Sequence, residues 1–370
     1  MALGLARSFV CRACRTQARR AFATASSTPR TDAQAFDNRV KIVEVGPRDG
    51  LQNEKTAIPL ATKIELIERL AKTGLSAIES GAFVSPKWVP QMSNSGEILE
   101  HILQRKIASP RQISYSFLAP NTKGFESAAD ILRRYPSAYV TSVEPSTILE
   151  NHTPPAPALE VAVFAAATES FSQKNLNCSI EESLARFREV IRAAKAMDLR
   201  VRAYVSVVLG CPFEGADVDP HRVAAVATDL LEAGADEISL GDTTGMGTAP
   251  RTKALLSCME AAGIRNEDVG MHFHDTYGQA LVNTAVALEH GIRTFDSAVG
   301  GLGGCPYSPG ATGNVATENM VYFLETLGMD TGVDLDAVAD IGAWITGELG
   351  KPNESSVGKA VLGARQRGAA

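Results

Sequence analysis

His272 and His274 stand two residues apart in a short apolar stretch, and this spacing could hold a metal ion. On an extended strand, residues two apart point to the same face, so both imidazoles could contact one ion. By itself such a pair is more often only the polar face of a strand. A carboxylate at Asp49 and an amide oxygen at Asn314 would complete a mixed nitrogen and oxygen donor set that suits Mg²⁺ or Mn²⁺. This metal interpretation requires a fold that brings the four residues together.

The segment from Gly300 to Asn314 could supply a reactive thiol. It holds six glycines in fifteen positions around one cysteine, Cys305, and this composition excludes a helix or a strand interior. Glycines let a loop approach a ligand closely and move over it. The alternative is a glycine-rich connection in which the thiol only packs. A helix is expected after the loop, with Asn314 near its N-terminus.

Three further charged residues, Arg48, Glu79 and Asp242, stand where predicted strands end. An arginine carries a permanent charge and a fixed fork of donors, which can stabilise a developing oxyanion. The carboxylates of Glu79 and Asp242 could serve as acids or bases. They could equally form ion pairs with Arg48. The sequence is compatible with both roles.

From Val40 onward, short apolar runs alternate with longer amphipathic segments. Helices are expected over 61–73, 180–196, 220–233 and 279–290. The runs that predict strands are 40–46, 77–83, 112–118, 160–167, 201–208, 237–242, 269–274 and 294–299. Eight such units predict an α/β fold, a (β/α)8 TIM barrel, over residues 40–328, with additional C-terminal helices and a tail over 329–370. A doubly wound sheet is the alternative, but it gives no reason for eight units.

A closed barrel would also gather the chemical residues. In TIM barrels the active site lies at the C-terminal ends of the strands. Asp49 follows the first predicted strand and Asn314 follows the eighth, and these two strands are neighbours only if the barrel closes. The metal interpretation and the barrel prediction therefore support each other.

Composition narrows the class of protein. The 370 residues are 45% hydrophobic, which allows a sizeable core. The net charge of −6 argues against a nucleic-acid binder. No apolar run reaches membrane-spanning length, so no membrane partner is expected. Six cysteines, mostly isolated, do not form a disulfide framework.

Residues 1–30 resemble a mitochondrial transit peptide, because they are rich in Arg, Ala, Ser and Thr and contain no acidic residue. Cleavage is predicted after Phe22, and Cys11 and Cys14 would leave with the removed segment. The mature chain is then expected in the mitochondrial matrix.

Four motifs together resemble the 3-hydroxy-3-methylglutaryl-CoA lyase family of metal-dependent TIM-barrel enzymes. They are VGPRDGLQNE at 45–54, FVSPKWVPQ at 83–91, HFHDTYGQ at 272–279, and the loop GLGGCPY with the following GATGN. The RDG element of the first motif and the HxH element of the third mark only the superfamily, which also includes isopropylmalate-type synthases, and GLGGCPY followed by GATGN is the specific part. Such synthases condense acyl-CoA substrates and are the alternative. Such synthases usually carry a long C-terminal regulatory domain, for which this chain has no room. The lyase is therefore favoured.

The resemblance implies roles for individual residues. It implies metal ligands at Asp49, His272, His274 and Asn314, with Mg²⁺ or Mn²⁺ as the cofactor. It implies catalytic or supporting roles for Cys305, Arg48, Glu79 and Asp242, and substrate contacts for Arg48 and Gln52. The expected substrate is an acyl-CoA, 3-hydroxy-3-methylglutaryl-CoA, and the expected assembly is a homodimer. One departure from the family pattern is a Pro-rich insertion near 133–158, expected on the barrel face opposite the active site.

The loop cysteine generates a first prediction. If Cys305 carries protons during turnover, Cys305→Ser should keep the fold and metal binding but lose most of kcat, because a serine hydroxyl has a far higher pKa than a thiol. Thiol-alkylating reagents should inactivate the wild-type protein, and bound substrate should protect it. Steady-state kinetics of both proteins provide the measurement. Near-normal kcat in Cys305→Ser would leave the thiol with a packing role only.

Overall fold

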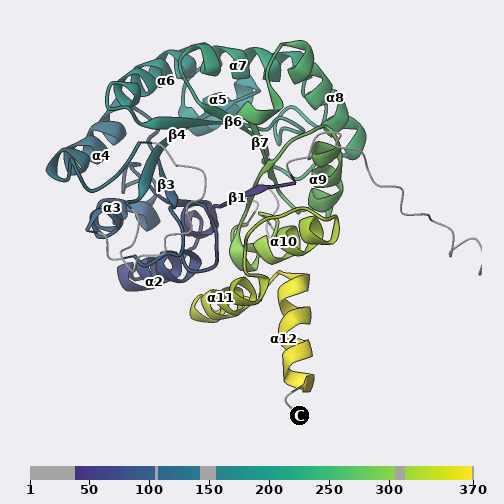
Figure 1. Ribbon diagram of the computed structural model, residues 1–370. Helices are drawn as coiled ribbons and strands as arrows, with labels where there is room; N and C mark the ends of the chain where they lie inside the picture. The colour runs from purple at the N-terminus through teal and green to yellow at the C-terminus, as the bar shows by residue number, and fades with distance from the viewer. Residues whose placement is uncertain (1–37, 105–106, 142–155, 305–312, 369–370) are drawn as a thin grey trace, which may run out of the picture. The chain divides into compact units, whose positions relative to one another are not determined.

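The computed structural model describes residues 38–104, 107–141, 156–304 and 313–368 (Figure 1). The predicted transit peptide, Cys305 and the central part of the Pro-rich insertion lie outside these ranges. Among the described helices, none has both the length and the apolar character needed to cross a membrane.

Eight parallel strands form a closed barrel in which each strand pairs with the next in sequence. The eighth strand pairs with the first, in a register that joins Lys41 to Thr294 and Glu44 to Ser297. The strands are β1 (Lys41–Glu44), β2 (Ala77–Ala82), β3 (Ser114–Leu118), β4 (Ala158–Ala166), β5 (Arg200–Ser206), β6 (Glu237–Asp242), β7 (Val269–Phe273) and β8 (Thr294–Ser297). Every apolar run that predicts a strand overlaps one of them, so the TIM-barrel prediction is confirmed.

Helices surround the barrel on its outside (Figure 1). The α-helices are α2 (Leu60–Leu70), α3 (Ser95–Leu103), α4 (Thr122–Arg134), α5 (Glu169–Leu176), α6 (Ile180–Lys195), α7 (Pro220–Glu232), α8 (Ala249–Ala261), α9 (Ala280–Glu289), α10 (Thr317–Thr326), α11 (Leu335–Glu348) and α12 (Ser356–Gly368). Short helical turns are η1 (Gly46–Gly50), η2 (Pro90–Met92), η3 (Asn266–Asp268) and η4 (Val299–Gly301). Local sequence sets several helix starts. The Ser179 hydroxyl accepts from the Glu182 amide and the Glu182 carboxylate accepts from Ser179, which is a capping box.

The connection from α4 to β4 is the long one predicted from the prolines. Its described ends are joined, because the Val140 amide donates to the Pro157 carbonyl at 2.9 Å and the Leu159 amide donates to the Val140 carbonyl at 3.2 Å. This junction lies beside Ala158, the first residue of β4. It is therefore at the N-terminal end of the strand, on the face opposite the strand ends that carry the polar motifs.

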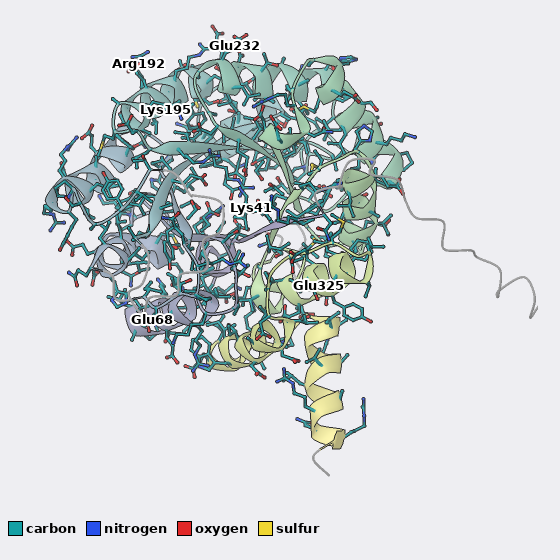
Figure 2. All side chains as sticks on the ribbon, viewed as in Figure 1. Lys41, Glu68, Arg192, Lys195, Glu232 and Glu325 are labelled. Carbon is teal, nitrogen blue, oxygen red and sulfur yellow. The ribbon has the colours of Figure 1, made fainter. Side chains whose placement is uncertain are left out.

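Charged side chains occupy the barrel interior as well as its surface. In Figure 2, Arg192, Lys195 and Glu232 lie on the outer helices, whereas Lys41 lies near the centre of the ring of helices. The Lys41 ammonium contacts Glu237 at 2.6 Å. Because a buried charge is costly without a partner, each charged side chain inside the barrel needs a group of opposite charge beside it.

Two buried carboxylates fix the turn η4, which leads from β8 into the glycine-rich loop. Glu44 accepts from the amides of Val299 at 3.0 Å and Gly46 at 2.8 Å. Glu318, at the start of α10, accepts from the Gly300 amide through both oxygens, at 3.1 and 3.0 Å. The C-terminal helices cover this junction so closely that a Cβ atom at Gly342 of α11 would clash with a Glu318 oxygen.

The Glu318 carboxylate generates a prediction about stability and pH. Burial, reinforced by the nearby Glu44, raises its pKa to about 8. The pKa of Glu44 is likewise raised by burial, to about 7. Between the ordinary carboxyl pKa and these values the folded state keeps a proton that the unfolded chain has lost, so the free energy of unfolding should fall as pH rises from about 5 to 8. For one proton the slope is up to about 1.4 kcal/mol per pH unit.

Glu318→Gln should flatten this slope, measured by urea unfolding of the metal-free protein at several pH values. The matched control is Glu348→Gln, which changes an exposed side chain on α11 and should leave the slope unchanged. Equal slopes for wild type and Glu318→Gln would contradict the prediction.

Candidate metal and active site

A cavity of about 300 Å³ opens at the C-terminal ends of the strands. Arg48, Asp49, Gln52, His272 and His274 line it. Leu118, Phe164 and Phe171 add an apolar wall. The structure therefore brings most of the predicted site residues to one cavity, as the barrel prediction requires.

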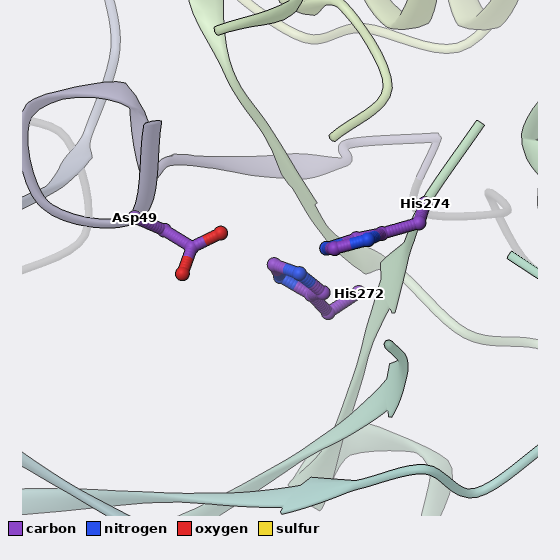
Figure 3. A group of neighbouring side chains, drawn as sticks. All are labelled: Asp49, His272 and His274. Atoms are coloured by element: carbon purple, nitrogen blue, oxygen red, sulfur yellow. The ribbon is translucent and has the colours of Figure 1, made fainter. Parts of the chain in front are cut away.

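Three predicted metal ligands converge from two elements. Asp49 lies in η1, which follows β1, while His272 belongs to β7 and His274 follows it directly. One possible ligand atom from each lies within 4.8 Å of those from the other two. Figure 3 shows the Asp49 carboxylate opposite the two imidazole rings, whose centroids are 5.2 Å apart. The period-two alternation of the strand thus places both rings on one side, as expected.

The two histidines differ in their surroundings. Burial, together with the neighbouring His272, lowers the pKa of His274 to about 4, so this ring is neutral at physiological pH. Its Nδ1 is buried and makes no hydrogen bond with any described residue. Burial opposes a charge on His272 also, but the Asp296 carboxylate outweighs it and raises the His272 pKa. Asp296 Oδ2 lies 3.1 Å from His272 Nδ1, so the other ring nitrogen is directed toward the cluster.

Asn314 lies beside this cluster. Its amide nitrogen donates to Asp49 Oδ2 at 2.8 Å and to the Leu302 carbonyl at 3.2 Å. Backbone pairing of Asn314 with His274 fixes its position. The expected helix follows as α10, which begins at Thr317 with Ala316 as its N-cap, so Asn314 lies near the helix start but is itself part of an extended segment that pairs with the chain after β7.

The cluster fits a divalent cation. A buried imidazole nitrogen without a hydrogen bond to the described residues is costly unless something else satisfies it. Burial favours the uncharged carboxyl of Asp49, but Arg48 and the two histidines hold its pKa well below the usual range, so the carboxylate is charged. Two imidazoles and one carboxylate then form an open mixed donor set. Asn314 as a fourth ligand remains a prediction.

Arg48 is held between two carboxylates. Its guanidinium lies 2.6 Å from Asp49 Oδ1 and 2.7 Å from Glu79 Oε2. Burial raises the pKa of Glu79, and the guanidinium opposes this. The ion pair between Glu79 and Arg48, one of the two roles left open by the sequence, is therefore present.

Asp242 forms no ion pair with Arg48 in the described part of the chain. It is fully buried at the end of β6 and accepts from the Gly247 amide at 2.9 Å. Its Oδ1 makes no hydrogen bond with a described residue. Burial raises the pKa of Asp242 to about 7.

The sequence did not point to three polar residues of the site: Tyr204, which lines the cavity, and Asp296 and Arg202, which lie behind its lining residues. Asp296, and not a residue adjacent in sequence, is the partner of His272 Nδ1, while Asp275, which directly follows His274, accepts from the Ala280 amide at the start of α9. The only local signal for these residues is a polar side chain within a predicted strand, and β5 and β8 each hold several of those.

The chain matches the HMGL-like family over residues 39–345. It is 50% identical over 324 residues to the "3-hydroxy-3-isohexenylglutaryl-CoA/hydroxy-methylglutaryl-CoA lyase" of Pseudomonas aeruginosa, covering 88% of this chain and 97% of the relative. It is 47% identical over 329 residues to the "Hydroxymethylglutaryl-CoA lyase, mitochondrial" of Gallus gallus, covering 88% and 99%. The crystal structure of hydroxymethylglutaryl-CoA lyase from Pseudomonas aeruginosa superimposes with a TM-score of 0.77 at 49% identity, covering 88% of this chain and 98% of that chain.

The cluster generates a prediction about metal binding. His274→Ala removes one of three converging ligands, so the dissociation constant of Mn²⁺ should rise at least tenfold and turnover should fall with it. Titration of the purified protein with Mn²⁺ provides the measurement. His101→Ala is the control, because His101 contacts Glu68 on the outer helices, away from the cluster. Full activity of the wild type in excess chelator would refute a metal requirement.

Proposed function

The chain belongs to the HMGL-like family and is a hydroxymethylglutaryl-CoA lyase, and we propose that the side chains around Asp49, His272 and His274 perform the cleavage. The reaction splits 3-hydroxy-3-methylglutaryl-CoA into acetyl-CoA and acetoacetate. The bond between C2 and C3 breaks, the C3 hydroxyl loses a proton and C2 gains one, so no oxidant or reductant is needed. The observation that carries the site assignment is that Arg48 and all three cluster residues line one cavity.

Asp49, His272 and His274 would hold a divalent cation, Mg²⁺ or Mn²⁺, with Asn314 beside them. When bound, such an ion supplies a Lewis acid that polarises the substrate oxygens. The neutral state of His274 and the charged state of Asp49 support this role, because metal ligands must be deprotonated.

Arg48 would stabilise the enolate. As the C2–C3 bond breaks, negative charge moves onto the thioester oxygen of the acetyl-CoA fragment. A guanidinium already fixed by Glu79 and Asp49 can stabilise the negative charge on that oxygen without first having to reorient. Gln52, which lines the same cavity, would contact the substrate.

Asp242 would accept the proton of the C3 hydroxyl. A general base works best when its pKa lies near the working pH, and the Asp242 pKa of about 7 meets this condition. The residues on either side of it, Gly241 and Thr243, line the cavity. Cys305 would return a proton to C2. Gly304, its neighbour in sequence, also lines the cavity and supports this role.

Two other functions are less well supported. A condensing synthase would share the barrel and the histidine pair, but each relative and solved structure described above is named a lyase. A barrel that had lost catalysis would be expected to lack one of the matched residues, and this chain has them all.

Location and assembly follow as further parts of the proposal. The arginine-rich first 30 residues and the mitochondrial relative of Gallus gallus support import into the mitochondrial matrix. The homodimer rests on the family resemblance alone.

The test of this function is acetoacetate formation from 3-hydroxy-3-methylglutaryl-CoA by the purified protein with Mg²⁺ or Mn²⁺. Arg48→Gln should lower kcat by about 100-fold to 1000-fold with little change in KM, because the proposed contact strengthens as the enolate forms. Arg48→Lys should restore little activity, since an ammonium lacks the planar fork.

Two outcomes would contradict the assignment. Absence of acetoacetate from the metal-loaded wild type would refute the lyase. A raised KM with unchanged kcat in Arg48→Gln would make Arg48 an anchor for the substrate and leave the enolate without this partner.

A further inference from the structure

Beneath the cavity, Arg202 of β5 connects the two halves of the site. Its guanidinium is almost fully buried and contacts Asp296 at 2.6 Å and Glu237 at 2.7 Å. Asp296 in turn contacts His272 Nδ1 at 3.1 Å. One arm from Arg202 therefore ends at a proposed metal ligand.

The second arm passes through Tyr204. The Tyr204 hydroxyl accepts from Arg202 Nη1 at 3.1 Å and donates to Glu79 Oε2 at 3.2 Å. That same Glu79 oxygen holds Arg48 at 2.7 Å, and Arg48 holds Asp49 at 2.6 Å. Because Asp49 and His272 belong to the same cluster, the two arms form a ring of contacts that closes at the metal site.

Tyr204 is the member of this ring that contacts both arginines. Its aromatic ring lies 5.6 Å from the Arg48 guanidinium carbon and 5.1 Å from that of Arg202. It meets the His272 ring edge-on, with centroids 6.1 Å apart. The side chain is 6% exposed and lines the cavity. Two cations beside one aromatic ring would repel each other if carboxylates did not flank both.

We propose that Tyr204 is a positioning residue that holds Arg48 and the metal cluster in one fixed geometry. The inference rests on the proposed function, in which Arg48 and the metal ligands must act on the same substrate. Without the Tyr204 hydroxyl, Glu79 keeps only Arg48 on Oε2, and its Oε1 already makes no hydrogen bond with a described residue. Glu79 and Arg202 would then shift toward new partners and move Arg48 and Asp296 with them.

Tyr204→Phe tests this because the phenyl ring keeps the shape and both cation contacts. kcat should fall about tenfold, and KM should change less than threefold. At saturating Mn²⁺, where weaker metal binding does not limit turnover, the same change in the Arg48→Gln background should lower kcat less than twofold, since an effect that acts through Arg48 is lost once Arg48 is gone. Tyr115→Phe is the matched control, a buried tyrosine of β3 that does not line the cavity, and it should be silent in both backgrounds.

The effect of Tyr204 on the metal cluster is measured separately. Titration with Mn²⁺ in the absence of substrate should give a dissociation constant about fivefold higher in Tyr204→Phe than in wild type, and unchanged in Tyr115→Phe. Equal constants for Tyr204→Phe and wild type, or a tenfold loss of kcat in both backgrounds, would overturn the proposal.

The Mn²⁺ titration needs no turnover, so absence of lyase activity would refute the proposed function while the titration still decides the role of Tyr204. If Tyr204→Phe does not fold, Glu79→Gln weakens the same contact between Glu79 and the Tyr204 hydroxyl. It must then lower kcat in the wild-type background but not in the Arg48→Gln background.

Discussion

The pairing of β8 with β1 is the constraint on which the site depends. Without it, Asp49 and Asn314 would lie at opposite edges of an open sheet, although their side chains are 2.8 Å apart in the barrel. Closure also brings Glu44 of β1 within reach of the Val299 and Thr317 groups that follow β8. Glu44 therefore fixes both η1, which carries Arg48 and Asp49, and η4, which begins the glycine-rich loop. One junction between the first and last strands sets the geometry of most of the polar mouth.

A second constraint is electrostatic. The barrel interior holds a row of charges that runs from Lys41 through Glu237, Arg202 and Asp296 to His272. Each charge has a partner of opposite sign within 4 Å, apart from the histidine, whose charge depends on protonation. Replacing such a row by apolar residues would often be neutral or stabilising in other proteins. Here the row ends at His272, a proposed metal ligand, so its charges can position the site as well as contribute to stability.

The sequence allowed the fold and much of the site to be predicted because their signals are local. Each strand overlaps a short stretch of mainly apolar or β-branched residues, and the HxH spacing of His272 and His274 is visible within three positions. Asp296, Arg202 and Tyr204 were not identified because no motif or spacing marks them: Arg202 and Tyr204 lie in β5, Asp296 lies in β8, and Arg202 and Asp296 are 94 positions apart in the sequence. Asn314 lies two residues before the N-cap of α10, close to the helix start that the sequence predicts, but its own backbone pairs with His274, and this pairing is not visible in the local sequence.

The junction between Val140 and Leu159 has a consequence for how this chain can diverge. Because backbone hydrogen bonds fix the two ends of the α4–β4 connection side by side, the number of residues between them has little effect on the barrel. Doubling the length of a flexible connection costs only about 0.6 kcal/mol of closure entropy. Insertions at this connection, whether they arise in evolution or are engineered as a fused reporter domain, should lower the stability of the barrel only slightly. They would lie on the face away from the substrate cavity.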